Sequence, residues 1–223
     1  MKHPTTIVFD LDGTLVHSAP DLRVAVNVSL AAIGRAPLDL EMVTSFVGNG
    51  VEVLIQCCLA ATGGTSDALL AQSLARFHGY YDANLVALTR PYPGVVDCLN
   101  RLRALGVTMG ICTNKPTEPA RQICDHLQLS QYFDVVMGAQ RGVPKKPDAA
   151  PLLACVAALG GDAQNALFVG DSKVDVQTAR NAGIALRFFT GGYHSALPTD
   201  LPTPQRFDEW APELADKWAG LAR

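Results

Sequence analysis

The stretch TTIVFDLDGTLV, residues 5–16, contains the strongest structural signal in this sequence. Its first half, TTIVFD, is a short β-branched and aromatic run closed by turn-forming residues, which predicts a buried strand. Asp10 and Asp12 follow at the end of that strand, and Gly13 allows the chain to turn sharply. Because side chains alternate along a strand, residues two apart point the same way while the backbone stays extended. The stretch therefore predicts two acids that share one side of a strand end.

Similar apolar runs recur in the second half of the chain, with helical patterns between them. The expected strands are VTMGICTN (107–114), DVVMGA (134–139), ALFVGD (166–171) and ALRFFT (185–190). The expected helices are 95–106, 118–129, 148–160 and 174–183. Alternation of strand and helix is typical of a parallel sheet with helices on both faces. We therefore predict the α/β class, with a Rossmann-like parallel sheet.

Residues 17–88 interrupt this alternation, because they contain helical patterns only. The patterns are 22–34, 41–64 and 67–88, with glycine clusters between them. The segment RPYPG, 90–94, would lead the chain back to the sheet, since its prolines and glycine do not fit inside a helix or a central strand. We predict two domains, an α/β core formed by 1–16 and 89–223 and an inserted helical cap formed by 17–88.

The composition narrows the class of protein. Of 223 residues, 48% are hydrophobic and 17% are charged, which is enough apolar material for a sizeable core. The net charge of −3, without any Lys/Arg-rich run, leaves no basic surplus for nucleic acid. We find neither a signal peptide nor an apolar run of about 18 residues, so we expect no membrane partner and a cytoplasmic location. The six cysteines form no CxxC pair and fit reduced thiols of a core.

Polar residues useful in phosphate chemistry follow three of the expected strands. Asp10 and Asp12 follow the first, Thr113 and Asn114 end the second, and Asp171 follows the fourth. Ligands of open parallel sheets bind beyond the carboxyl ends of the strands, so these residues should meet at one edge. Each residue alone could be an ordinary turn former or helix cap. Together they predict a site for a phosphorylated ligand.

The acids of this site would repel a phosphate dianion and one another. At about 4 Å and an effective dielectric constant of about 20, each like-charge pair costs roughly 4 kcal/mol. Phosphate can therefore bind only if a cation is present. Hard oxygen ligands, with no Cys or His in a suitable position, favour Mg²⁺. We predict Mg²⁺ as the cofactor.

Four motifs in this order make the chain resemble the haloacid dehalogenase-like superfamily, in its capped phosphatase branch. The motifs are DLDGTL (10–15), CTN (112–114), KKP (145–147) and GDSKVD (170–175). The resemblance covers nearly the whole chain. It implies the core fold of that superfamily with an inserted helical cap, and the activity of a phosphoric monoester hydrolase.

The resemblance also implies catalytic roles for the matched residues. Asp10 would be the nucleophile that becomes an aspartyl phosphate. Asp12 would protonate the leaving alcohol and later deprotonate the attacking water. Thr113 and the Asn114 backbone amide would bind the transferring phosphoryl oxygens, and Lys146 would balance charge between the phosphate and the nucleophile.

The same resemblance implies the metal ligands. They would be the Asp10 and Asp171 carboxylates and the Asp12 backbone carbonyl. Asp175, one helical turn after Asp171, would orient these ligands or pair with Lys146.

Three features of the sequence qualify the resemblance. Lys145 competes with Lys146 for the role of the motif lysine, although the motif places its lysine directly before proline. His17 stands where relatives often carry Asp, and the loop Thr190–His194 (TGGYH) replaces a more usual Tyr-Gly-Tyr loop. Neither departure touches the four motifs.

Within the family, the best likeness is to enzymes that hydrolyse 2-phosphoglycolate. It is carried by LVHSAPDL, FVGNGVE, RPYPGV, TNKP and VPKKPDAAPL. The cap would choose the substrate. The turn Gly48, Asn49 and Gly50 could bring backbone N–H groups close to an anion, and Arg23 could pair with the glycolate carboxylate. Each has an ordinary alternative, a helix break for the turn and a solvated helix face for Arg23.

We therefore expect Mg²⁺-dependent hydrolysis of a small phosphorylated metabolite, with 2-phosphoglycolate giving glycolate and phosphate. Alternatives are a phosphatase of another sugar phosphate or of a nucleotide, a phosphomutase, and a non-catalytic sensor of a phosphorylated ligand on the same fold. Residues 17–88 contain no lysine, which argues against Schiff-base chemistry there. The acid at Asp12 disfavours a dehalogenase. The sequence leaves monomer and homodimer equally open.

Overall fold

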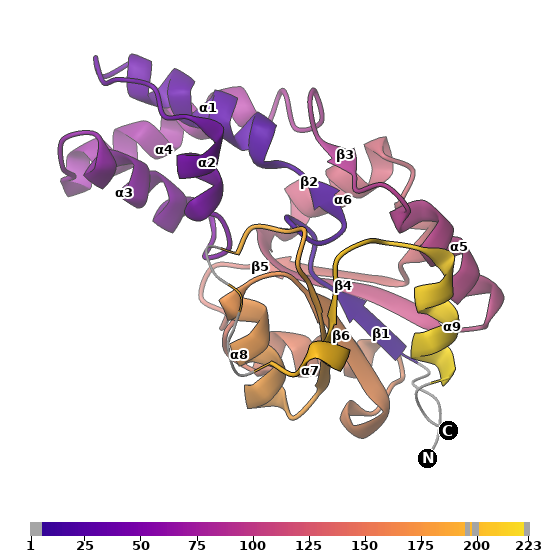
Figure 1. The fold of residues 1–223 in the computed structure, drawn as a ribbon. Coiled ribbons are helices and arrows are strands. Elements are labelled where there is room, and N and C mark those ends of the chain that lie inside the picture. Colours follow the sequence, from indigo (N-terminus) through magenta and orange to yellow (C-terminus); the bar gives the residue numbers. More distant parts are fainter. Residues whose placement is uncertain (1–5, 195–196, 198–200, 221–223) are drawn as a thin grey trace.

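The computed structural model describes residues 6–194, 197 and 201–220. Its centre is a six-stranded sheet with the strand order β5-β4-β1-β6-β7-β8 (Figure 1). The strands are β1 (Thr6–Phe9), β4 (Thr108–Pro116), β5 (Val135–Ala139), β6 (Ala166–Gly170), β7 (Ala185–Phe189) and β8 (Arg206–Phe207). All neighbouring strands run parallel. The predicted α/β class with a Rossmann-like parallel sheet is confirmed, and the short β8 is an addition that we did not predict.

Helices cover both faces of this sheet, as the alternation along β1 requires. The helices are α5 (Val95–Ala104), α6 (Thr117–His126), α7 (Ala150–Ala158), α8 (Lys173–Ala182) and α9 (Pro212–Gly220). Ile7 and Phe9 pack in one apolar cluster with residues of α5, α6 and α9. Val8, between them, packs in a second cluster with residues of α7 and α8. All three side chains are fully buried, because a parallel sheet of this kind has no solvated face.

Four further helices form a group beside the sheet (Figure 1). They are α1 (Ala19–Ala31), α2 (Leu40–Ser45), α3 (Val51–Ala61) and α4 (Asp67–Tyr81). The helical pattern over 41–64 forms two helices, because Gly48 and Gly50 adopt φ values of 125° and 90°, a region that favours glycine and ends the helical path. The predicted helix over 67–88 ends at Tyr81, so its last seven residues are predicted wrongly.

The two connections between this helical group and the sheet lie side by side. β2 (Val16–His17) pairs antiparallel with β3 (Arg90–Pro91). Next to this pair, the Asp21 carboxylate accepts hydrogen bonds from Leu88 N at 3.0 Å, and from Thr89 N and Thr89 Oγ1 at 2.7 Å each. Asp21 is only 4% exposed. A single buried carboxylate therefore joins the entry and the exit of the helical group.

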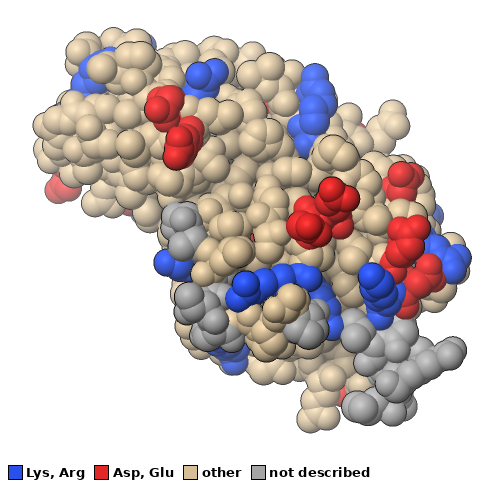
Figure 2. All heavy atoms as spheres, in the orientation of Figure 1, with Lys and Arg blue, Asp and Glu red and all other residues tan. Residues whose placement is uncertain are grey.

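The surface in Figure 2 has no continuous basic face on the side shown. Isolated charged side chains lie over α1–α4, and Lys/Arg and Asp/Glu are interspersed over the part that contains the sheet. None of the helices in the described part of the chain is both long enough and apolar enough to cross a membrane. All six cysteines are free, and only Cys57 is not buried.

Replacement of Asp21 by alanine should destabilise the fold. The change leaves the two buried donors of Thr89 and the part-buried N–H of Leu88 without their carboxylate. Hydrogen bonds to a charged group are worth about 1.5–3 kcal/mol each in a net sense. We expect Asp21→Ala to lower the free energy of unfolding by about 3 kcal/mol, measured by urea denaturation. Asp134→Ala, which changes an exposed aspartate, should lower it by less than about 1 kcal/mol. Equal small effects of the two changes would contradict this role of Asp21.

Candidate active site

The polar residues that follow the strands lie together at the carboxyl edge of the sheet. Asp10 follows β1, Thr113 and Asn114 belong to the end of β4, and Asp171 follows β6. β4 and β6 both pair with β1, so the three strand ends are adjacent. All four side chains are buried. The parallel sheet therefore delivers residues from three distant parts of the sequence to one place.

A buried lysine lies at the centre of this group. Lys146 Nζ lies 2.9 Å from Asp10 Oδ1 and 2.7 Å from Asp175 Oδ1, and Lys146 is only 2% exposed. Burial alone would lower the pKa of Lys146, but the two carboxylates outweigh burial and raise it. The neighbouring Lys145 is exposed, and its Nζ donates a hydrogen bond to Asn49 O at 2.8 Å. Of the two lysines in the KKP motif, only Lys146 contacts the acids.

Three carboxylates form the group that could hold a metal ion. Ligand oxygens of Asp10, Asp171 and Asp175 lie within 4.8 Å of one another, and all three residues are buried. Asp171 is oriented from both sides, because its Oδ1 accepts from Thr14 Oγ1 and its Oδ2 accepts from Tyr193 N, at 2.6 Å each. A cluster of hard oxygen donors with this spacing fits Mg²⁺.

The protonation of these acids also reflects their crowding. Burial raises the pKa of Asp10 from 3.8 to about 6, with Asp175 adding to the rise and Lys146 opposing it. Burial also raises the pKa of Asp171 well above its ordinary value, and the nearby carboxylates of Asp175 and Asp10 add to that rise. Burial therefore makes the ionised carboxylates costly, and a divalent cation would relieve that cost.

Asp175 is held by the start of α8. Its Oδ2 accepts from Asp171 N at 3.2 Å, from Ser172 N at 3.0 Å and from Ser172 Oγ at 2.6 Å. Ser172 Oγ in turn accepts from Asp175 N, which completes a capping box. Since its Oδ1 faces Lys146, both oxygens of Asp175 already have protein partners. Asp175 is thus a rigid buried support beside Asp10 and Asp171.

Asp12 lies outside the group of three carboxylates and has different partners from Asp10. Lys115 Nζ donates to Asp12 Oδ1 at 3.2 Å and to Oδ2 at 3.0 Å, and Ser18 Oγ donates to Oδ1 at 2.5 Å. Lys115 Nζ also donates to the Tyr81 hydroxyl of α4 at 2.9 Å. The two acids of the DLDGT motif therefore have separate lysine partners, which suits two different chemical tasks.

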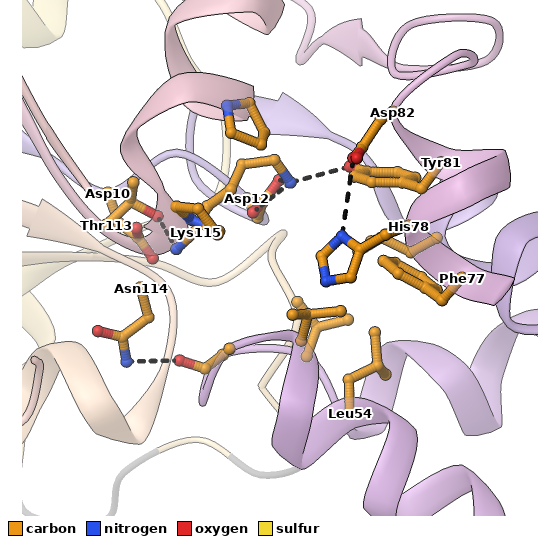
Figure 3. Close-up of a pocket in the computed structure, with 17 residues that line it drawn as sticks. Asp10, Asp12, Leu54, Phe77, His78, Tyr81, Asp82, Thr113, Asn114 and Lys115 are labelled. Carbon is orange, nitrogen blue, oxygen red and sulfur yellow. Dashed lines mark hydrogen bonds and ion pairs between the residues drawn. The ribbon is translucent and has the colours of Figure 1, made fainter. Parts of the chain in front are cut away.

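A cavity of about 60 Å³ lies between this edge of the sheet and the helical group. Its sheet side is polar and contains Asp10, Asp12, Thr113, Asn114 and Lys115. Its helical side is mostly apolar, with Leu22, Val47, Val51, Leu54 and Phe77. Figure 3 shows these two sides facing each other, with Leu54, Phe77, His78 and Tyr81 opposite the acids. A ligand in this cavity would contact both parts of the chain.

The residues predicted to bind substrate from the helical group are placed differently from one another. Gly48 and Gly50 line the cavity, whereas Asn49 and Arg23 are not among the residues that line it. Asn114 Nδ2 donates to Gly48 O at 3.0 Å (Figure 3). The turn therefore contacts the sheet edge through its carbonyl groups. A role in substrate binding remains a prediction for Arg23 and for the turn.

Sequence reasoning did not identify several residues of the site. Lys115 could have been found, since it lies two residues after Thr113 on an extended strand and so points to the same side. Tyr81 and Tyr193 meet their partners only through the packing of distant segments. Ser18 lies six residues after its partner Asp12, across the turn that follows β1.

His17 and the Thr190–His194 loop, which are expected to depart from the family pattern, are in contact with each other. His17 Nδ1 lies 3.0 Å from the Tyr193 hydroxyl, and the backbone N–H of Ala19 donates to the same hydroxyl at 2.8 Å. Tyr193 belongs to the loop Thr190–His194. The loop therefore joins the start of α1 to the Asp171 carboxylate.

Comparison with known proteins agrees with the fold and the motifs. The sequence model of the haloacid dehalogenase-like hydrolase family matches residues 4–183. The chain is 48% identical over 197 residues to a phosphoglycolate phosphatase of Cereibacter sphaeroides, which covers 88% of this chain and 89% of that protein. It is 40% identical over 223 residues to a phosphoglycolate phosphatase of Rhodospirillum rubrum, with coverages of 98% and 92%.

A solved structure extends this likeness to three dimensions. The crystal structure of a predicted phosphoglycolate phosphatase from Haemophilus somnus has a TM-score of 0.87 with this structure and 31% sequence identity, and the match covers 97% of this chain and 99% of that chain. The chain belongs to the haloacid dehalogenase-like hydrolase family. The resemblance seen in the four motifs is thus confirmed.

Ionisation of Asp10 should destabilise the fold of the metal-free protein. Because its pKa is raised from 3.8 to about 6 in the folded state, the stabilising effect of protonation is fully present below about pH 4 and is lost as the pH rises through about 6. Asp10→Asn removes this ionisation. In EDTA at about pH 7.5 we expect the variant to be about 2 kcal/mol more stable than the wild type, with the difference vanishing near pH 4.

Urea unfolding at a series of pH values measures this difference. Asp134→Asn is the matched control, because the same change at an exposed site should leave the pH dependence as it is in the wild type. A less stable Asp10→Asn protein at about pH 7.5 would show that the ion pair with Lys146 outweighs the burial of Asp10.

Proposed function

We propose that the protein is a Mg²⁺-dependent phosphatase of a small phosphorylated metabolite, with 2-phosphoglycolate as its substrate. The observation that carries this proposal is that the two acids of DLDGT line one cavity with separate lysine partners, Asp10 beside Lys146 and Asp12 beside Lys115. The names of the relatives from Cereibacter sphaeroides and Rhodospirillum rubrum support the choice of substrate.

In this reaction Asp10 attacks phosphorus with a carboxylate oxygen, and the bond between phosphorus and the ester oxygen breaks. Asp12 gives its proton to the departing ester oxygen, so that glycolate leaves as an alcohol. The aspartyl phosphate on Asp10 is then hydrolysed by a water whose proton Asp12 takes, which returns both acids to their starting state and releases phosphate. Thr113 and the Asn114 backbone amide hold the phosphoryl oxygens throughout, and Lys146 balances charge between the phosphate and Asp10.

The residues present fit a bound Mg²⁺. The Asp10 and Asp171 carboxylates and the Asp12 backbone carbonyl would hold the ion, and Asp175 would keep the neighbouring groups in place. When bound, the ion neutralises negative charge on the phosphoryl group and on the crowded carboxylates. Thr14 and the backbone of Tyr193 fix the orientation of Asp171 for this task.

The helical group formed by residues 17–88 would act as a cap over the core formed by 1–16 and 89–223. It supplies the apolar side of the cavity and closes it above Asp10 and Asp12. The names of the relatives favour 2-phosphoglycolate over larger phosphate esters, and hydrolysis over a phosphomutase reaction.

Loss of the nucleophile should abolish turnover without loss of the fold. We expect Asp10→Asn to reduce kcat for 2-phosphoglycolate by roughly 10,000-fold or more, measured as release of inorganic phosphate, with an unchanged circular dichroism spectrum. EDTA should abolish wild-type turnover, and added Mg²⁺ should restore it. Asp134→Asn is again the control and should keep wild-type kcat. Full activity in EDTA would remove the metal from the mechanism.

Among phosphate esters of different size, we expect the enzyme to prefer 2-phosphoglycolate. With 2-phosphoglycolate, glucose 6-phosphate and a 5′-nucleotide compared by kcat/KM, we expect 2-phosphoglycolate to lead by about 100-fold. A higher kcat/KM for the sugar phosphate or the nucleotide would show that 2-phosphoglycolate is not the preferred substrate. The assignment as a phosphate ester hydrolase would then stand. Tight binding of these compounds without phosphate release would favour the ligand sensor instead.

A further inference from the structure

Lys115 is the one lysine or arginine on the described wall of the cavity. It lies on β4, is 7% exposed, and directs Nζ to both oxygens of Asp12 and to the Tyr81 hydroxyl. The ammonium group is therefore a fixed positive charge beside Asp12, and the proposed chemical steps give it no task.

The substrate places a second negative charge close to this lysine. In 2-phosphoglycolate a single CH₂ group separates the ester oxygen from the carboxylate. If Asp12 exchanges a proton with the ester oxygen, the substrate carboxylate must lie within a few bond lengths of Asp12. Two carboxylates this close repel each other unless a cation or a hydrogen-bond donor faces both. Lys115 Nζ is the cation already in that position.

Tyr81 supplies the donor. Its hydroxyl accepts the hydrogen bond from Lys115 Nζ, and the structure shows no acceptor among the described residues for the hydroxyl hydrogen. Tyr81 is 4% exposed and lines the cavity from α4 (Figure 3). Burial raises the pKa of Tyr81, so the phenol keeps its hydrogen. A buried hydroxyl with a free hydrogen, next to an ammonium group, is suited to a carboxylate oxygen.

We propose that Lys115 of β4 and Tyr81 of α4 together form the subsite that recognises the carboxylate of the substrate. This proposal rests on the proposed function. The sequence suggested Arg23 as the partner of the substrate carboxylate, but Arg23 is not among the residues that line the cavity. The proposal assigns this role to one residue of the sheet edge and one residue of the helical group. The subsite is complete only when α4 lies over β4, so carboxylate recognition requires the closed arrangement of the two parts.

His78 is the competing candidate. Its side chain also lines the cavity, but it is 44% exposed and its Nδ1 lies 3.7 Å from Asp82 Oδ1. Solvent screens an exposed group of this kind, and the neighbouring carboxylate competes with an anionic ligand. Lys115 and Tyr81 are buried and therefore discriminate more strongly between ligands with and without charge.

The test compares two substrates that differ only in the group to be recognised. They are 2-phosphoglycolate and 2-hydroxyethyl phosphate, in which CH₂OH replaces the carboxylate, and the readout is the ratio of their kcat/KM values. We expect Lys115→Met to reduce this ratio by roughly 100-fold and Tyr81→Phe by about tenfold. Lys115→Arg should keep the ratio within about tenfold of the wild type, since a guanidinium also pairs with carboxylates.

Control variants separate recognition from other effects. Lys217→Met, on the exposed side of α9, should leave both rates unchanged. An unchanged ratio in Lys115→Met and Tyr81→Phe, even with both rates lowered, would show that Lys115 only holds Asp12 and would overturn the proposal. If only His78→Gln lowers the ratio of the two kcat/KM values, the proposal is wrong and His78 recognises the carboxylate. If Lys115→Met does not fold, Tyr81→Phe and Lys115→Arg decide by the same ratio.

The wild type itself distinguishes failure of this proposal from failure of the proposed function. Hydrolysis of both substrates with equal kcat/KM would overturn the carboxylate subsite and leave a phosphatase. Hydrolysis of neither would overturn the proposed function.

Discussion

The site depends on the neutralisation of carboxylates that the fold brings together at one edge of its sheet. The acids are Asp10, Asp171 and Asp175, which are buried, and Asp12, which is partly buried. Like charges about 4 Å apart cost roughly 4 kcal/mol per pair at an effective dielectric constant of about 20, so these groups cannot lie together without compensation. The protein supplies two buried lysines, Lys146 between Asp10 and Asp175 and Lys115 beside Asp12. Four acids and two lysines leave an excess of negative charge, which fits a divalent cation. Burial is the main cause of the raised pKa values of Asp10 and Asp171, and the neighbouring carboxylates add to it.

The part of this arrangement that follows from strand ends was predictable. An apolar run closed by a polar residue identifies a strand and its carboxyl end, and parallel pairing brings such ends to one edge. Asp10, Thr113 and Asp171 obey this rule, because their strands are adjacent in the sheet. Lys146 lies on a loop, where hydrophobic periodicity gives no signal, so only the KKP motif could predict that it belongs to the site.

The contacts between the helical group and the sheet edge were not predictable from local pattern. Tyr81 and Lys115 are 34 residues apart, and their contact depends on how α4 packs over β4. The turn at Gly48 is expected to offer N–H groups to an anion, and the structure adds a contact that we did not predict, in which its carbonyl oxygen accepts from Asn114. A glycine turn in a sequence shows that the backbone is free to turn, and only packing decides which of its polar groups faces the site.

The same packing connects the position of α1 to the acid cluster. The backbone N–H of Tyr193 orients Asp171, while its hydroxyl accepts from Ala19 N at the first residue of α1 and contacts His17. Gly13 is required beside this loop, since its φ is 85° and a Cβ there would clash with the Asp171 carboxylate. A shift of α1 relative to the sheet would therefore pull on the loop that orients Asp171. His17 and the Thr190–His194 loop lie far apart in the sequence, yet in the fold they form one contact, which links the start of α1 to Asp171.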